Sequence, residues 1–207
     1  MNPNSVREFL CENWSDGSSK LHDLERFLDF VDGFLTNEKT YFEEEAHPDL
    51  ELEFLPLFAA TFPPILHSSF IISVSILLEQ EMRGFTKLLL LAIGSELRYG
   101  DFSGSVLERF RTVATKLASL PFDEVIVPWE DIVAVFEIRN CLVHANGSLA
   151  EFTRSATIIG FVDRHQMPSV DAEVLRVDIL TSRRVLAVAS TFLDGIYRVA
   201  LNRFPKT

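Results

Sequence analysis

Apolar residues recur at helical spacing along most of the chain. Between Ser19 and about Glu45 they return every three or four positions, which predicts an amphipathic helix with an acidic outer face. These positions are Leu21, Leu24, Phe27, Leu28, Val31, Phe34 and Leu35. A long apolar segment then follows the pair Pro63-Pro64 and continues to about Arg98, and we expect it to form a central helix.

Two further helices have recognisable first turns. Ser105 and Glu108 have the spacing of a capping box, which predicts a helix from residue 105 to about residue 120. Pro128, followed by two acidic residues, favours the start of another helix. We expect that helix to cover 129–145 and to end in the "ANG" sequence at Gly147.

The last part of the chain predicts loops and one more helix. Residues 151–178 mix β-branched and polar residues, so we expect loops there, with a short β-hairpin as the only regular structure. The pattern becomes helical again over 181–204. About five helices with short connections predict an all-α fold, an antiparallel bundle with a four-helix core and an additional helix. No internal repeat or long Gly/Ser linker divides 1–207, which favours a single domain.

Composition supports a folded chain with an uneven charge. Hydrophobic residues make up 47% of the 207 residues, and 18 residues are phenylalanine, which excludes an intrinsically disordered protein. Residues 151–207 carry 8 basic and 6 acidic side chains, a net charge of +2, whereas residues 1–150 carry 11 basic and 24 acidic ones, a net charge of −13. This acidity argues against a protein that coats nucleic acid, but it allows one that holds a phosphate at a single site.

Several classes of protein are disfavoured by what the sequence lacks. The N-terminus has no apolar signal region, and the longest apolar run, 62–78, contains His67 and several serines, so we expect a cytoplasmic protein without a membrane helix. Cys11 and Cys141 do not have metal-site spacing. We therefore expect no metal and no cofactor. We expect His67 to lie in the core and Cys141 to be a small buried hydrophobic residue. His22, His47 and His165 are widely separated and show no metal-binding i, i+4 pairing with each other.

The stretch "VFEIRNCLVHANG" places arginine, asparagine and histidine in an otherwise apolar helix. Burying such groups without partners costs about 1–3 kcal/mol each. On a helix, Glu130, Glu137, Asn140 and His144 fall within an arc of roughly 80°, while the remaining sides are largely apolar. A helix of this kind packs from more than one direction, so one side can face the bundle core and another a second subunit.

Arg139 does not share this polar arc. It is five positions before His144, which places the two about 140° apart on an ideal helix. Three explanations are open: the long arginine side chain reaches across, the helix loosens before Gly147, or two copies of the motif meet in a dimer. We favour the homodimer, because two-fold pairing brings two arginines and two histidines to one cleft.

The residues Arg139 to His144 resemble the R-x4-6-H motif of the HEPN superfamily (higher eukaryotes and prokaryotes nucleotide-binding domains), with a polar residue after the arginine. The surrounding "FEIRNCLVHANG" is similar to bacterial HEPN proteins in which the motif lies late in a four-helix bundle. The order of the predicted helices also resembles that fold, over a core of about residues 20–204. The likeness therefore predicts a single HEPN-like domain.

This resemblance implies a metal-independent endoribonuclease in a dimeric bundle, of a kind often used in toxin-antitoxin or phage-defence systems. In that case His144 would move protons at the ribose 2′-hydroxyl or the leaving 5′-oxygen. Arg139 would stabilise the charge that develops on the scissile phosphate, and Asn140 would orient the imidazole or bind the phosphate. RNA supplies its own nucleophile, so neither a metal nor a nucleophilic serine or cysteine is required.

Other interpretations stay open beside the catalytic one. The chain could be a catalytically silent, dimeric HEPN-like regulator, an antitoxin-type module that binds a cognate partner protein. The polar residues could also form a network that ties the helix end to its neighbours. Glu137 is either a supporting group for His144 or Arg139, or an exposed helix carboxylate. Glu79 is a further candidate, as a buried partner for Arg139.

Overall fold

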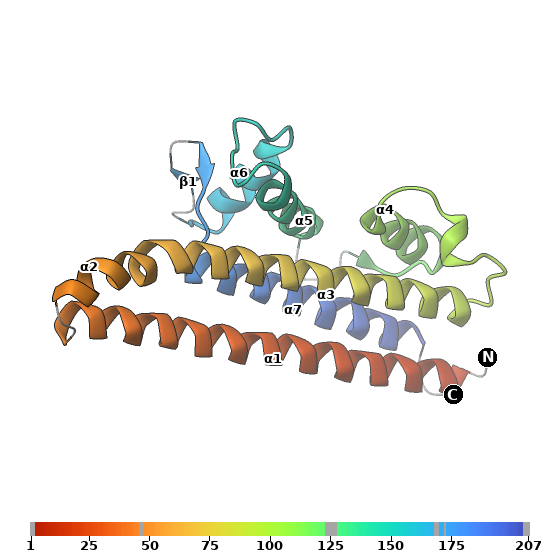
Figure 1. Cartoon of the computed structure of the whole chain (residues 1–207). Helices are drawn as coiled ribbons and strands as arrows, with labels where there is room; N and C mark the ends of the chain where they lie inside the picture. Colours follow the sequence, from red (N-terminus) through yellow and green to blue (C-terminus); the bar gives the residue numbers. More distant parts are fainter. Residues whose placement is uncertain (1–2, 46–47, 123–127, 168–169, 172, 205–207) are drawn as a thin grey trace. The chain divides into compact units, whose positions relative to one another are not determined.

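The structure, a computed structural model, describes residues 3–45, 48–122, 128–167, 170–171 and 173–204, and the described part is almost entirely helical (Figure 1). The all-α prediction is confirmed. Among the described residues, two short strands inside the 151–178 segment pair as an antiparallel hairpin. The elements are α1 (Pro3–Glu44), α2 (Pro48–Pro56), α3 (Phe62–Ala92), α4 (Val106–Arg111), α5 (Trp129–His144), α6 (Ser155–Arg164), β1 (Val170–Asp171), β2 (Val174–Leu175) and α7 (Ile179–Arg203).

Two helices continue through π-helical turns. The turn Leu57–Thr61 joins α2 to α3 without interruption, and Thr112–Leu117 extends α4. At the start of α4, Ser105 Oγ accepts from the Glu108 backbone N–H at 3.3 Å, and the Glu108 carboxylate accepts from the Ser105 N–H at 2.6 Å. The predicted capping box is therefore confirmed.

The helix α3 ends earlier than the apolar pattern predicts. It stops at Ala92 rather than near Arg98, because Gly94 takes a left-handed conformation with φ +66°. The Ser95 N–H then donates to the Leu90 carbonyl at 2.9 Å, which is the hydrogen bond of a Schellman cap. The glycine therefore ends the helix although apolar residues continue beyond it.

The prediction of loops over 151–178 is wrong for α6. The β-branched run within Ser155–Arg164 suggested irregular or extended chain, but the segment is an amphipathic helix. Its buried side chains are Ile158, Phe161 and Val162, which have the i, i+3, i+4 spacing of one helix face. Burial of this face therefore outweighs the weak intrinsic preference of β-branched residues for strands.

The helix α1 also begins earlier than predicted, at Pro3 instead of Ser19. Its first half buries few residues, among them Val6, Leu10 and Gly17. Their spacings of four and seven residues match a helix that buries one narrow stripe. That stripe contains too few apolar residues to be recognised against the polar residues between them.

Residue contacts divide the chain into two compact units. Unit 1 contains Met1–Leu21, Ser75–Val133 and Ala187–Thr207, and unit 2 contains His22–Val74 and Ala134–Leu186. Each unit combines segments that are distant in the sequence, so neither corresponds to one continuous stretch of chain. The residues of the predicted site at the end of α5 all belong to unit 2, whereas Glu79 belongs to unit 1.

The core of unit 1 is built around aromatic rings. Phe110 is fully buried, and its ring centre lies 5.8 Å from those of Phe85 and Phe192. The Trp129 ring stacks on Phe110 at 6.1 Å, and Tyr197 meets Phe85 edge-on at 5.0 Å. These offset and edge-to-face arrangements are the favourable geometries for aromatic pairs. The rings therefore join α3, α4, α5 and α7 within this unit.

A buried carboxylate lies beside this core. Glu81 accepts hydrogen bonds from Tyr197 Oη and from Lys20 Nζ, each at 3.4 Å. Burial, together with the negative charge of Glu81, raises the pKa of the Tyr197 phenol. A Cβ atom at Gly17 would lie 3.0 Å from Glu81 Oε2, so the absence of a side chain there leaves room for the carboxylate.

We expect Glu81→Ala to lower the free energy of unfolding by about 2–4 kcal/mol, because it leaves a buried hydroxyl without an acceptor and removes buried volume. Urea denaturation measures the change. Glu79→Ala is the matched control, because Glu79 is half-buried on the same helix and pairs with Arg83 one turn away. It should cost less than about 1 kcal/mol, and equal losses for the two variants would contradict this role of Glu81.

The core of unit 2 contains a buried histidine. His67 is 4% exposed, and its Nδ1 lies 3.2 Å from Ser182 Oγ on α7. Burial lowers the pKa of the imidazole, while the charges of Asp32 and Asp178 act in the opposite direction. His67 is thus a core histidine with a polar partner, as the sequence predicts.

His67 should make unit 2 less stable in mild acid. Because its pKa is lower in the folded chain than the unfolded value of about 6.5, the unfolded chain binds the proton more strongly. The free energy of unfolding should therefore fall as the pH decreases below about 6.5, and stay at its full value above neutrality. Urea denaturation across this window should give a smaller slope for His67→Gln than for the wild type. The control His22→Gln changes an exposed side chain and should keep the wild-type slope.

Two helical stretches, Pro48–Ala92 and Ile179–Arg203, are long and apolar enough to cross a membrane by length and composition. Their most apolar windows are 33% and 67% buried, respectively, inside the protein. Core helices of soluble proteins meet the same criterion, so this finding is weak evidence for a membrane segment.

Candidate functional site at the end of helix α5

The second half of α5 is buried on most sides. Val135, Ile138 and Cys141 are fully buried, and Glu137 is 4% exposed. The exposure of the predicted polar residues rises toward the end of the helix: Arg139 and Asn140 are half-buried, and His144 is exposed. The helix therefore presents its polar groups to solvent only over its last turns.

Arg139 and Asn140 contact each other directly. The guanidinium donates from Nη1 to Asn140 Oδ1 at 2.9 Å. Within the described residues, no hydrogen bond joins either side chain to His144. The structure therefore brings together two of the three predicted residues, and the single chain leaves His144 with its ring accessible at the helix end.

Glu137 has a partner that the sequence does not reveal. Its carboxylate accepts from Arg154 Nη1 at 2.6 Å, although the two residues are 17 positions apart. The Glu137 side chain is 5% exposed, while that of Arg154 is 69% exposed. The alternative of an exposed helix carboxylate is thus wrong. Glu137 instead fixes Arg154, the residue before α6, against α5, and leaves much of the guanidinium in solvent.

Arg154→Ala should destabilise unit 2 by about 1–2 kcal/mol, because it leaves the buried carboxylate of Glu137 without this cation. The double variant Glu137→Gln/Arg154→Ala should recover part of the loss, since a neutral amide is less costly to bury. Chemical denaturation of the four chains in this cycle measures the coupling. Arg184→Ala, an exposed arginine of α7, serves as a control and should be neutral. Equal effects of the two arginine variants would exclude the proposed coupling.

The chain leaves α5 through a turn that is fastened to the hairpin. Gly147 has φ +80°, and its N–H donates to the Cys141 carbonyl at 3.2 Å, so the predicted helix stop is confirmed. The Leu175 N–H donates to the Gly147 carbonyl at 2.8 Å, and a Cβ atom at Gly147 would lie 3.1 Å from Leu175 O. The turn therefore requires glycine both for its dihedral angle and for its approach to β2. His144 therefore lies just before a turn that these hydrogen bonds hold against β2.

Cys141 has the structural role that its surroundings predict. Its Sγ lies 3.8 Å from the Ser148 carbonyl oxygen, and the residue is fully buried. Burial raises the pKa of the thiol, which disfavours the reactive thiolate. Cys141 therefore contributes packing next to the site.

Glu79 has a partner on its own helix. Arg83 Nη2 donates to Glu79 Oε1 at 2.6 Å, the i,i+4 arrangement of a helix surface pair. Glu79 lies in unit 1 and Arg139 lies in unit 2. A direct pairing of Glu79 with Arg139 is a sequence prediction that these contacts leave without support.

The described residues contain no group of three or more His, Cys, Asp or Glu side chains placed to hold a metal ion. His47, one of the histidines considered from the sequence, lies outside the described residues. Arg139, Asn140 and His144 offer two amide or imidazole ligands at most and one permanent cation, which is a set suited to a phosphate rather than to a metal.

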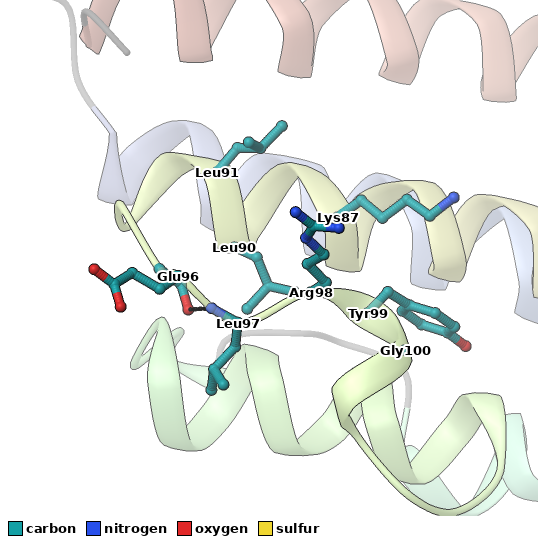
Figure 2. A pocket seen from close by; sticks show the side chains of 9 residues that line it. Lys87, Leu90, Leu91, Glu96, Leu97, Arg98, Tyr99 and Gly100 are labelled. Atoms are coloured by element: carbon teal, nitrogen blue, oxygen red, sulfur yellow. Dashed lines mark hydrogen bonds between the residues drawn. The ribbon is translucent and has the colours of Figure 1, made fainter.

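A separate pocket of about 530 Å³ lies in unit 1, at the end of α3. Its lining comes from the last turns of α3 and from the segment after it, and includes Leu90, Glu96, Leu97 and Tyr99 (Figure 2). The Leu97 N–H donates to Ser95 Oγ at 3.1 Å. None of the residues that line this pocket belongs to the predicted site on α5.

No protein-family model, curated protein or solved structure matches the chain. Support for a function therefore comes from the residues at the end of α5, from their contacts, and from their resemblance to the R-x4-6-H motif.

Proposed function

We propose that the chain is a metal-independent endoribonuclease that acts at the end of α5. The observation that supports this most is the placement of Arg139, Asn140 and His144 on the last turns of an otherwise buried helix. An exposed imidazole and a half-buried guanidinium on the last turns of one helix provide a proton carrier and a fixed positive charge, which are the two groups that RNA cleavage needs. Because the proposed substrate is RNA, we expect the protein to be cytoplasmic.

The proposed reaction uses the ribose 2′-hydroxyl as its nucleophile. The 2′-oxygen forms a bond to phosphorus while the bond to the 5′-oxygen breaks, which produces a 2′,3′-cyclic phosphate and a free 5′-hydroxyl. One imidazole takes the proton of the 2′-hydroxyl, and another gives a proton to the leaving 5′-oxygen. Arg139 stabilises the additional negative charge on the phosphate oxygens. Asn140 holds the guanidinium through the 2.9 Å hydrogen bond.

A homodimer would complete this site. Arg139 and His144 point in directions about 140° apart on an ideal helix, and the guanidinium bonds to Asn140. A second chain related by a two-fold axis supplies a second imidazole and a second guanidinium to the same cleft. Light scattering should find a dimer at working concentration, and a monomer that still cleaves RNA would contradict the shared cleft.

The local charge around α5 is compatible with RNA. Residues 134–186 contain six arginines and six acidic residues, whereas residues 22–74 contain two basic and eleven acidic ones. The Arg154 guanidinium remains 69% exposed near α5 even though it pairs with Glu137. We therefore expect RNA to approach from the α5–α6 segment, and we expect cleavage to weaken as salt concentration rises.

The test is incubation of the purified chain with RNA in EDTA. We expect fragments with new 5′-hydroxyl ends, and no cleavage of DNA of the same sequence, because DNA lacks the 2′-hydroxyl. Intact RNA under these conditions, or cleavage only after a divalent metal is added, would overturn the proposal.

A catalytically silent, dimeric regulator is the second candidate. The observation that favours it is the hydrogen bond from Arg139 to Asn140, because residues of a structural network also make such contacts. This candidate predicts harmless expression, tight binding to a partner protein and no RNA cleavage. If the chain is instead a ribonuclease toxin, its expression should arrest growth, and the arrest should require His144. Expression of the wild type and of His144→Ala in growing cells separates the two.

A further inference from the structure

One side of α1 in unit 2 exposes a row of aromatic side chains. Phe27, Phe30, Phe34 and Tyr41 are 53%, 73%, 48% and 44% exposed, respectively. On a helix these four positions fall within an arc of about 60°. We call them the aromatic stripe. The buried side of the same helix, with Leu21, Leu28 and Leu35, lies in a different direction, so the stripe is separate from the core.

Aromatic contacts hold the part of α1 that carries the stripe against neighbouring segments. Phe34 meets Phe58 edge-on at 6.2 Å, and Phe42 stacks between Phe54 and Phe58 at 5.5 and 5.4 Å. These contacts join the second half of α1 to α2 and to the turn after it, all within unit 2. The exposed rings therefore project from a helix that its neighbours hold in place, which lowers the entropic cost of binding.

The surroundings of the stripe are strongly acidic. Residues 22–74 carry eleven acidic and two basic side chains, a net charge of −9. Asp23 and Glu38 are each four residues from a stripe residue and lie on the same side of α1, where Arg26 is also one turn from Phe30; Glu45 follows directly after the helix. The surface thus combines exposed aromatic rings with a rim of carboxylates.

This combination selects among the possible occupants. Exposed apolar patches on folded chains mark interaction sites, and their charged rims decide which partner fits. A second copy of this segment would bring a charge of −9 against another of −9, and an anionic membrane surface would repel it in the same way. A basic amphipathic helix complements both features, because its apolar face covers the rings and its lysines or arginines meet the carboxylates.

We propose that the aromatic stripe is the docking surface for a basic amphipathic helix of a partner protein. The surface and its partner are independent of the RNA site, because the stripe includes none of the α5 residues. A chain that fails to cleave RNA would still bind such a helix, and the reverse also holds.

The probe is a fluorescent peptide of about 18 residues, five helical turns, in which leucine occupies one face and lysine the rest. Fluorescence anisotropy should show binding to the wild-type chain that weakens as salt increases. A scrambled peptide of the same composition should bind at least about ten-fold more weakly, and an amphipathic peptide with glutamate in place of lysine should not bind. Equal binding of the scrambled and ordered peptides would overturn the proposal.

Variants locate the binding surface. Phe30→Ser should weaken binding at least about ten-fold, because central aromatic side chains contribute most to such interfaces. Leu180→Ser is the matched control, since Leu180 is 57% exposed in the same unit but outside the stripe. It should leave binding unchanged, and so should His144→Ala. Glu38→Gln should weaken binding moderately and reduce its salt dependence.

Three outcomes would contradict the proposal. The first is unchanged peptide binding by Phe30→Ser. The second is a wild-type dimer that dissociates in Phe30→Ser, which would make a second copy the occupant. The third is association with uncharged lipid vesicles that Phe30→Ser abolishes, which would make a membrane surface the occupant. Phe30 is 73% exposed, so its replacement leaves the core intact and each result is interpretable.

Discussion

Replacing His144 with alanine is expected to lower the rate of RNA cleavage in EDTA by about 10²–10⁴-fold, the usual contribution of a general acid or base. The side chain is exposed at the end of α5, so its removal should leave the fold and the free energy of unfolding nearly unchanged. Initial rates with end-labelled RNA measure the first effect, and urea denaturation measures the second. The two measurements together distinguish a loss of catalysis from a loss of folded structure.

Substitutions of Arg139 provide a second test of the same site, again through the rate of RNA cleavage. Arg139→Ala should reduce cleavage by about 10²–10³-fold, because the charge on the phosphate oxygens loses its stabilising partner. Arg139→Lys should recover only part of the rate, since lysine keeps the charge but loses the planar donor fork. Arg184→Ala, an exposed arginine elsewhere in unit 2, is the control for general loss of RNA attraction. Undiminished cleavage by Arg139→Ala or by His144→Ala would rule out the proposed site.

Phe110→Ala is the second change with a large expected effect. Phe110 is fully buried and contacts Phe85, Trp129 and Phe192, so its removal leaves a cavity at the centre of unit 1. We expect the free energy of unfolding to fall by about 3–5 kcal/mol, a large part of the total stability of an ordinary domain. Chemical denaturation, or the yield of soluble protein, measures the loss.

The control for this change is Phe30→Ala, which removes the same side chain from a position that is 73% exposed. It should alter the free energy of unfolding by no more than about 0.5 kcal/mol. Similar losses at the two positions would mean that the aromatic cluster of unit 1 does not carry the stability that its packing indicates.

Local signals explain which helices the sequence predicts well. The bounds of α5 follow from Pro128, from acidic residues in its first turn and from Gly147, all of which act within a few residues of the helix ends. The helix α6 escapes notice because its β-branched residues favour extended chain in isolation. The i, i+3, i+4 spacing of Ile158, Phe161 and Val162 is a helical signal, but only the burial of these side chains shows that it outweighs the preference of the β-branched residues.

In the candidate site, too, local patterns are visible in the sequence, whereas tertiary contacts are not. Helix periodicity alone places Glu137, Asn140 and His144 on one side of α5, but their exposure, from buried at Glu137 to exposed at His144, does not follow from it. The burial of Glu137 and its bond to Arg154 depend on the chain returning to α5 after 17 residues, which is a tertiary contact. The pairing of Glu79 with Arg83, in contrast, is visible in the sequence as an i,i+4 Glu–Arg pair.

The most direct test of RNA cleavage at the end of α5 compares two versions of one oligonucleotide in EDTA. The first is an RNA whose cleaved bond has been mapped, and the second carries a 2′-O-methyl group at the nucleotide that supplies the nucleophile. We predict that the wild-type chain cuts the first into a 2′,3′-cyclic phosphate and a 5′-hydroxyl, and that the same bond stays intact in the second. An uncut first RNA, or equal cutting of both, would contradict the proposed function.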